Sequence, residues 1–146
     1  MEAIILSGIQ GAGKSTFCKD IFWDTHIRLN YDMLRTRYRE RLLLEAMISA
    51  KQPFVVDGTN PTEVERALYI NAVKHAGFFL KGIQFYIDLE NAITRNALRD
   101  PKRRVPDKAI KATIKKMTEM RYEEGFDLII KATVSADTIS LTEIPK

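Results

Sequence analysis

The sequence predicts an α/β fold in which a parallel sheet is covered by helices on both faces. Five short apolar segments have the length of buried strands, segments of helical character separate them, and a glycine-rich turn follows the first strand directly. The chain has 146 residues, which suits one domain of roughly 100–200 residues with a single core. We therefore expect residues 1–146 to form one domain built from βαβ units.

The first half of the chain contains three of the five predicted strands. Residues 3–6 form a continuous apolar run that is typical of a strand buried on both faces, and a helix follows from Lys14. Residues 26–29 are a weaker strand candidate. A long helix rich in Leu, Arg, Glu and Met is expected over residues 32–50, and residues 54–56 form the third strand.

Residues 60–63 predict the start of the next helix. Asn60 is a good N-cap, Pro61 suits the first helical position, and Glu63 places an acidic side chain at the third. We expect this helix to end near Gly77, where glycine favours the end of a helix.

The remainder of the chain continues the alternation of strands and helices. Residues 78–87 are a strand region interrupted by Gly82, and a helix then runs from Asp88 until Asp100-Pro101 ends it. A basic loop follows, and another helix is expected after Pro106. Residues 126–130 are the fifth strand, whereas residues 137–146 give no signal.

Composition and charge exclude several classes of protein. Hydrophobic residues make up 45% of the chain and charged residues 29%, as in globular proteins and unlike disordered or fibrous ones. No apolar run approaches the roughly 18 residues that span a bilayer, and the N-terminus lacks the features of a secretory signal, so we expect a cytoplasmic protein with no membrane partner. Residues 95–121 contain ten Lys/Arg but three Asp/Glu, which predicts an anionic ligand.

The glycine-rich turn matches a phosphate-binding pattern. Residues 8–15 fit G-x-x-x-x-G-K-[ST] at every fixed position and lie between a buried strand and a helix. Glycines let backbone amides approach phosphates, Lys14 neutralises the β- and γ-phosphates, and Ser15 offers a hydroxyl to Mg²⁺. We therefore predict an ATP and Mg²⁺ site; a glycine turn without a ligand is the alternative, and the flanking strand and helix argue against it. The residues expected to bind the nucleotide are Gly11, Ala12, Gly13, Lys14, Ser15 and Thr16.

Further candidates concern the group that would accept a phosphoryl group. A kinase needs a carboxylate for the acceptor hydroxyl and positive charge over the transferred group. Asp32 begins a predicted helix and Arg35 lies three residues later, so both could contact one bound molecule. The spacing alone fits a capping Asp with an exposed Arg equally well. Asp57 follows the third strand and could organise water on Mg²⁺, contact the acceptor or support a turn.

In this order the motifs resemble the 5′-polynucleotide kinases of the bacteriophage type. The resemblance rests on the phosphate loop, on Asp32 with Arg35 after a strand, on Asp-x-Thr-Asn at residues 57–60, and on Arg-Asn-x-x-Arg at residues 95–99 before a basic lid. It covers most of the chain. It implies a three-layer P-loop NTPase fold with a doubly wound parallel five-stranded sheet, in the order 2-3-1-4-5, and an arginine-bearing lid.

The resemblance also implies an activity, which is transfer of the γ-phosphoryl group of ATP to a 5′-hydroxyl end of RNA or DNA, as in nucleic-acid repair. Asp32 would be the general base, Arg35 would bind the phosphate between the first two nucleotides, and Arg99 would be the lid arginine over the transferred group. Only the kinase part of such enzymes is expected in this chain. A kinase of a small metabolite or nucleoside is the alternative. A non-catalytic binding module is disfavoured because Lys14, Ser15 and Asp32 are all present.

Overall fold

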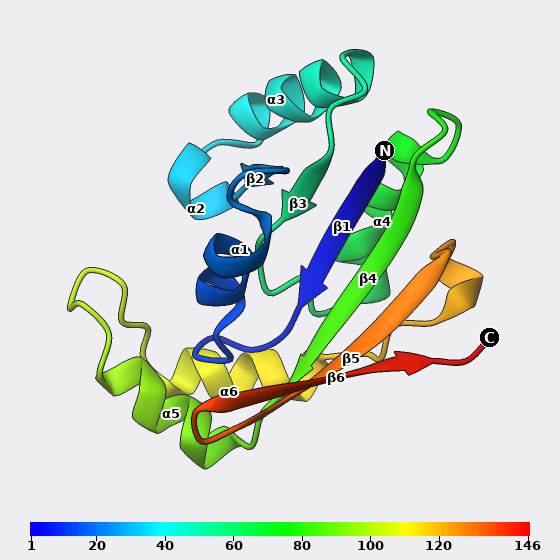
Figure 1. Ribbon diagram of the computed structural model, residues 1–146. Helices are drawn as coiled ribbons and strands as arrows, with labels where there is room; N and C mark the ends of the chain where they lie inside the picture. The colour runs from blue at the N-terminus through cyan, green and yellow to red at the C-terminus, as the bar shows by residue number, and fades with distance from the viewer.

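The computed structural model describes residues 1–146 and contains one six-stranded sheet in the order β2-β3-β1-β4-β5-β6 (Figure 1). The first five strands are parallel in the predicted order, and the sixth is antiparallel to β5. The α/β class and the order of these five strands are therefore confirmed. The strands are β1 (Glu2–Ser7), β2 (Ile27–Leu29), β3 (Phe54–Val56), β4 (Phe79–Tyr86), β5 (Leu128–Ser135) and β6 (Thr138–Ile144).

Helices cover both faces of the sheet and make the fold three-layered. The helices are α1 (Lys14–Phe22), α2 (Tyr31–Leu34), α3 (Arg37–Ser49), α4 (Glu63–Val73), α5 (Leu89–Ala97) and α6 (Asp107–Lys116), with a short 3₁₀ turn at Tyr122–Glu124. Side chains of α3 and α4 pack with Ala3 and Ile5 of β1, whereas side chains of α1 pack with Ile4 and Leu6 on the opposite face. Alternate side chains of β1 therefore belong to two separate hydrophobic cores, one on each face of the sheet. None of the helices has the length and apolar character needed to cross a membrane.

The sixth strand, β6, was not predicted because its sequence lacks the usual signals of a strand and of the turn before it. β6 is an edge strand whose side chains are mostly exposed, including Ile139 and Leu141, so it lacks the apolar run of a buried strand. The tight turn before it has Ala136 at φ 43°, although asparagine, aspartate or glycine usually signals such a turn. The five-stranded all-parallel sheet is therefore corrected to a mixed six-stranded one.

The single helix predicted over residues 32–50 is wrong, because the structure divides it into α2 and α3. Arg35 has φ 69° and ends α2, and the Thr36 hydroxyl then accepts a hydrogen bond from the Arg39 amide to cap α3. Asn30 caps α2 by accepting from the Met33 amide, so Asp32 is not a helix cap.

The predicted start of α4 is also corrected. Thr62, not Asn60, is the N-cap, and Thr62 and Glu65 form a reciprocal capping box. Asn60 instead has φ 37° and donates its Nδ2 to the Leu6 carbonyl oxygen at 2.7 Å. The helix ends at Val73, earlier than Gly77. Asn60 therefore ties the α4 connection to β1, which a local capping rule could not reveal.

Candidate active site

A polar cavity of about 540 Å³ lies beyond the carboxyl ends of β1, β2 and β3, with the end of α5 and the following loop forming its other wall. In the sheet Ile5 pairs with Val56, which in turn pairs with Leu29, so the segments that follow these strands emerge at one edge. Of the predicted site residues, the cavity is lined by Gly11, Gly13, Lys14, Ser15, Thr16, Asp32, Asp57 and Arg99. Ala12 is buried in the core, and Arg35 does not line the cavity.

The phosphate loop has the conformation that its glycines predict. Gly11 and Gly13 have φ values of 82° and 88°, which side chains rarely tolerate. A Cβ atom on Gly11 would lie 2.5 Å from the Ala92 carbonyl oxygen, so that position has no room for one. Gly13 caps α1 and brings no side-chain acceptor to the first amides of the helix. These amides therefore suit an anion placed against the loop.

Lys14 is a buried cation that is held over the loop. Its Nζ donates hydrogen bonds to the carbonyl oxygens of Gly8 and Ile9, both at 2.8 Å, and the residue is 8% exposed. Burial lowers the pKa of Lys14 from 10.5 to about 8; the Asp57 carboxylate raises it and Arg99 lowers it further. The nearby Asp57 carboxylate forms its ion pair with Arg28 and not with Lys14, so a bound phosphate would supply the negative charge that pairs with Lys14.

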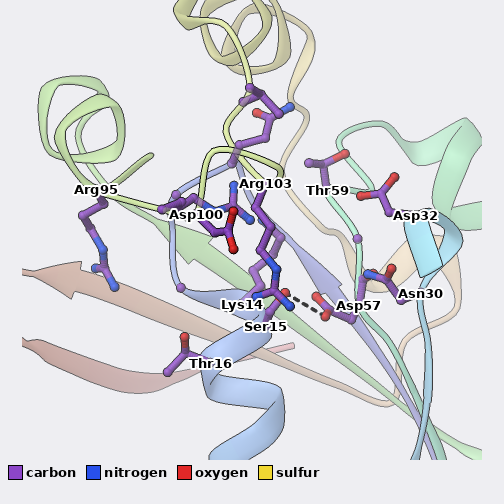
Figure 2. A pocket seen from close by; sticks show the side chains of 16 residues that line it. Lys14, Ser15, Thr16, Asn30, Asp32, Asp57, Thr59, Arg95, Asp100 and Arg103 are labelled. Carbon is purple, nitrogen blue, oxygen red and sulfur yellow. Dashed lines mark hydrogen bonds between the residues drawn. The ribbon is translucent and has the colours of Figure 1, made fainter. Parts of the chain in front are cut away.

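Ser15 and Asp57 form the part of the site that fits a divalent cation. The Ser15 Oγ donates to Asp57 Oδ2 at 3.0 Å (Figure 2), and the Arg28 Nε donates to the same oxygen at 2.7 Å. Asp57 is 2% exposed, and its backbone oxygen accepts a hydrogen bond from Asn30. A hydroxyl and a carboxylate are hard oxygen ligands, and Mg²⁺ is typically held by one or two such groups together with phosphates and water. Arg28 was not predicted as a site residue.

The segment that carries Asp57 and Thr59 is anchored to the phosphate loop. The Gly8 amide donates to the Thr59 carbonyl oxygen at 3.0 Å, and the Ser7 hydroxyl donates to the Asn60 carbonyl oxygen at 3.0 Å. Arg66 lies behind the segment with no exposed surface and makes two hydrogen bonds, both 2.8 Å, to the buried carboxylate of Glu124. Its Nη1 also donates to the carbonyl oxygens of residues 60 and 61. Arg66 thus fixes the wall of the cavity from within the core.

Asp32 reaches the cavity from α2. Figure 2 shows Asp32 and Thr59 on one side of the cavity and Arg95 on the other, with Lys14 between them. The Asp32 carboxylate makes no hydrogen bond or ion pair within the chain. Asp32 is the second residue of α2, the helix that was expected to place Arg35 on the same face. Because α2 ends at the left-handed Arg35, the helical spacing that should align these two side chains is broken.

Three arginines line the opposite wall, although a role was predicted only for Arg99. Arg95 and Arg103 line the cavity with it, and a Cβ atom on Gly13 would lie 3.0 Å from the Arg95 guanidinium. The Asn96 side chain holds the loop by donating to the Val105 carbonyl oxygen at 2.7 Å and accepting from its amide at 3.1 Å. Arg95 lies in α5 and Arg99 directly after its end, and their i, i+4 spacing was a usable signal for Arg95; no local pattern marked Arg103.

The phosphate loop, the buried lysine and the arginine wall define this α/β domain as a P-loop kinase domain. The sequence profile described as "AAA domain" matches residues 4–125, and the chain belongs to that family.

The chain is also similar to individual proteins. Over 130 residues it is 27% identical to the "Bifunctional polynucleotide phosphatase/kinase" of Schizosaccharomyces pombe; the match includes 86% of this chain but 32% of the relative, so the chain spans about a third of that protein. Among solved structures, a gluconokinase from Sinorhizobium meliloti 1021 superposes with a TM-score of 0.67 at 16% identity, covering 92% of this chain and 83% of the other. Kti12 from Chaetomium thermophilum, in complex with ADP-AlF3, has a TM-score of 0.66 at 14% identity, covering 92% and 89%. The two structures show the fold.

Proposed function

We propose that this chain transfers the γ-phosphoryl group of ATP to a 5′-hydroxyl end of RNA or DNA, with Asp32 as the general base. The observation that carries the proposal is the position of Asp32. Its unpaired carboxylate lines the same cavity as Lys14 and Ser15, with Arg99 also in the wall. A phosphoryl donor held by the loop and an acceptor hydroxyl held by Asp32 would therefore share one cavity.

The comparisons support both the proposed phosphoryl donor and the proposed acceptor. The fission yeast relative has a polynucleotide kinase activity in its name. The Kti12 structure carries ADP and a fluoroaluminate, which supports a nucleoside triphosphate as the donor. The resemblance of residues 32–35, 57–60 and 95–99 to the bacteriophage-type polynucleotide kinases supports the same acceptor.

The residues of the cavity divide the chemistry between them. Lys14 and the first amides of α1 would bind the β- and γ-phosphates, and Ser15 and Asp57 would hold Mg²⁺, which neutralises phosphate charge when bound. Asp32 accepts the proton of the 5′-hydroxyl while the hydroxyl oxygen forms a bond to the γ-phosphorus of ATP. The bond between the γ-phosphorus and the bridging oxygen of the β-phosphate breaks at the same time. The planar guanidinium of Arg99 stabilises the charge that spreads over the transferred group, and ADP leaves.

A kinase of a small metabolite or nucleoside is the second candidate. The fold similarity to a gluconokinase favours it, and the same loop, carboxylate and arginines would serve a small alcohol equally well. The two candidates differ in the acceptor, so the acceptor must be tested directly.

Transfer of label from γ-labelled ATP in the presence of Mg²⁺ tests the proposal, with 5′-hydroxyl oligonucleotides offered beside a panel of sugars and nucleosides. We expect labelled oligonucleotide 5′ ends. Asp32→Asn should lower kcat by about 100-fold or more, because general-base catalysis contributes about 10²–10⁴, while ADP still binds. Asp20→Asn, which changes an exposed carboxylate of α1 outside the cavity, is the matched control. Label on a metabolite alone would contradict the polynucleotide acceptor, and full activity of Asp32→Asn would contradict the base.

A further inference from the structure

A second surface rich in arginine and tyrosine lies beside Asp32, outside the cavity. We call it the α2–α3 surface. All of its side chains are exposed, and it is outside the basic segment that the sequence singled out at residues 95–121. Its members are Tyr31, Arg35, Arg37, Tyr38, Arg39 and Arg41.

The tyrosine rings of this surface are already stacked against guanidinium groups. The Arg37 guanidinium carbon lies 4.1 Å from the centre of the Tyr31 ring, and that of Arg41 lies 5.6 Å from the centre of the Tyr38 ring. Tyr38 is 62% exposed, so much of its ring remains open. Such exposed aromatic rings bind the faces of nucleobases, and arginine adds a cation–π contribution and contacts phosphates.

An apolar hollow of about 850 Å³ adjoins this surface. Leu44, Leu68 and Ala72 from α3 and α4 supply its apolar lining, while Tyr38 and Arg41 stand among its walls. An apolar floor with cations around it matches a nucleotide, whose base is a flat ring and whose phosphate is an anion.

Two carboxylates also line the hollow, and both have cationic partners. Glu40 is buried and accepts a hydrogen bond from Arg37 at 2.7 Å and another from Tyr69 at 3.1 Å. Glu45 is exposed and lies 3.7 Å from Arg41. Arg35 and Arg39 have no carboxylate partner, so the exposed charge of the surface is positive overall.

The α2–α3 surface is continuous with the acceptor side of the cavity. Asp32 lines the cavity, Tyr31 precedes it in α2, and Arg37 of α3 lies over the Tyr31 ring. In Figure 1, α2 follows β2 and lies next to α3, on the side of the molecule away from α5 and α6. A polynucleotide with its 5′-hydroxyl at Asp32 can continue only in the 3′ direction. The α2–α3 surface is basic and aromatic and lies beside Asp32, so it is where we expect the rest of the strand to bind.

We propose that the α2–α3 surface binds the single-stranded segment of the acceptor that lies 3′ of the reacting nucleotide. Bases stack on Tyr31 and Tyr38, and phosphates contact Arg39 and Arg41. This inference rests on the proposed function, since it takes the acceptor to be a polynucleotide. It explains why a small domain would carry unpaired arginines on this face as well as in its lid.

The test measures binding of a single-stranded 5′-hydroxyl oligonucleotide by fluorescence anisotropy. The oligonucleotide has about ten nucleotides, which is long enough for one typical single-strand site, and it carries the fluorescent label at its 3′ end. Tyr38→Ala should weaken binding about tenfold, the usual scale for loss of one base-stacking contact. Arg39→Gln/Arg41→Gln should lower the slope of log Kd against log salt by about 1.4, since each phosphate contact to a single strand contributes about 0.7. Glu45→Gln should tighten binding, because it removes the carboxylate opposite Arg41.

Trp23→Ala and Lys19→Gln are the control variants, since the first removes one exposed aromatic ring and the second one cation, both from the end of α1 and away from the α2–α3 surface. These controls should keep the wild-type affinity and salt slope. In labelling assays, Tyr38→Ala should also reduce the preference for the longer acceptor over a dinucleotide, measured as the ratio of kcat/KM.

The outcomes separate the inference from the function on which it rests. If the wild type phosphorylates oligonucleotides but the surface variants bind and select them as the wild type does, the α2–α3 surface is not the strand site, while the kinase proposal stands. If only metabolites are phosphorylated and no oligonucleotide binds, both proposals are overturned.

Discussion

Raising the pH should weaken nucleotide binding through a single buried amine, that of Lys14. Its pKa is lowered to about 8 in the free protein because the ammonium is buried against the carbonyl oxygens of the loop. The phosphates of ADP would bring negative charge to this cation and return its pKa towards the ordinary 10.5. Above pH 8 the free protein has lost a proton that the complex retains. Binding must therefore take up a proton, and affinity must fall as the pH rises.

The size of this effect follows from the two pKa values. If bound phosphates return the pKa of Lys14 from about 8 to its ordinary value of 10.5, the Kd for ADP should be about tenfold weaker at pH ~9 than at pH ~7. The same shift affects the stability of the free protein. Between about pH 8 and 10.5 the unfolded chain binds more protons at Lys14 than the folded chain does, so the contribution of Lys14 to folding stability rises through this window, by about 3 kcal/mol. The pKa of Cys18, which burial raises to about 11, gives a contribution of the opposite sign at the upper end of this window.

Isothermal titration calorimetry with ADP, in the absence of metal, measures both the affinity and the proton uptake. Two buffers of different ionisation enthalpy at pH ~9 should give different apparent enthalpies, because binding takes up a proton there. Lys14→Met should bind ADP weakly, with little change between pH ~7 and ~9. A wild-type Kd that stays constant over this range would refute the assignment of a lowered pKa to Lys14.

Two further predictions concern the packing that holds the site. Arg66→Met should destabilise the fold by about 3–5 kcal/mol in urea unfolding, because it leaves Glu124 buried and unpaired. The double variant Arg66→Met/Glu124→Gln should recover part of this loss. Equal stability of the single and the double variant would contradict a stabilising ion pair between Arg66 and Glu124. Gly11→Ala should be more destabilising than Gly77→Ala. Both glycines have positive φ, which costs roughly 1–2 kcal/mol for alanine, but at Gly11 the new Cβ also meets the Ala92 carbonyl oxygen at 2.5 Å, whereas at Gly77 its nearest neighbour is Met1 Cε at 3.9 Å. Similar thermal unfolding of the two variants would show that the contact with Ala92 relaxes.

The parts of the site that were predictable from sequence are those whose chemistry is local. The loop from Gly8 to Ser15 requires particular residue types at fixed spacing, because amides and a cation must meet the phosphates while a hydroxyl meets the Mg²⁺ beside them. The carboxylates at 32 and 57 follow predicted strands, and parallel strands bring their carboxyl ends to one edge. The structure lines one cavity with these residues.

Local reasoning was wrong where two local signals competed or where a partner distant in sequence decided the outcome. Thr36 caps a new helix after the left-handed Arg35, so the Leu- and Arg-rich run that predicted one helix became two. Asn60 has good capping chemistry, yet its amide is used by the Leu6 carbonyl oxygen of β1. In each case both outcomes satisfy local preferences, and only packing selects between them.

The sequence by itself determined the α/β class and the phosphate loop, because apolar runs and glycine spacing act over a few neighbouring residues. The order of the five parallel strands came from the resemblance of the motifs to a known family. Only the tertiary structure decided that Arg28 shares an oxygen of Asp57 with Ser15, that Arg103 joins Arg99 in the wall, and that Arg35 stays outside. These arrangements depend on the distance and direction between segments that the chain folds together. The spacing of residues within any single segment of the sequence therefore cannot predict these contacts.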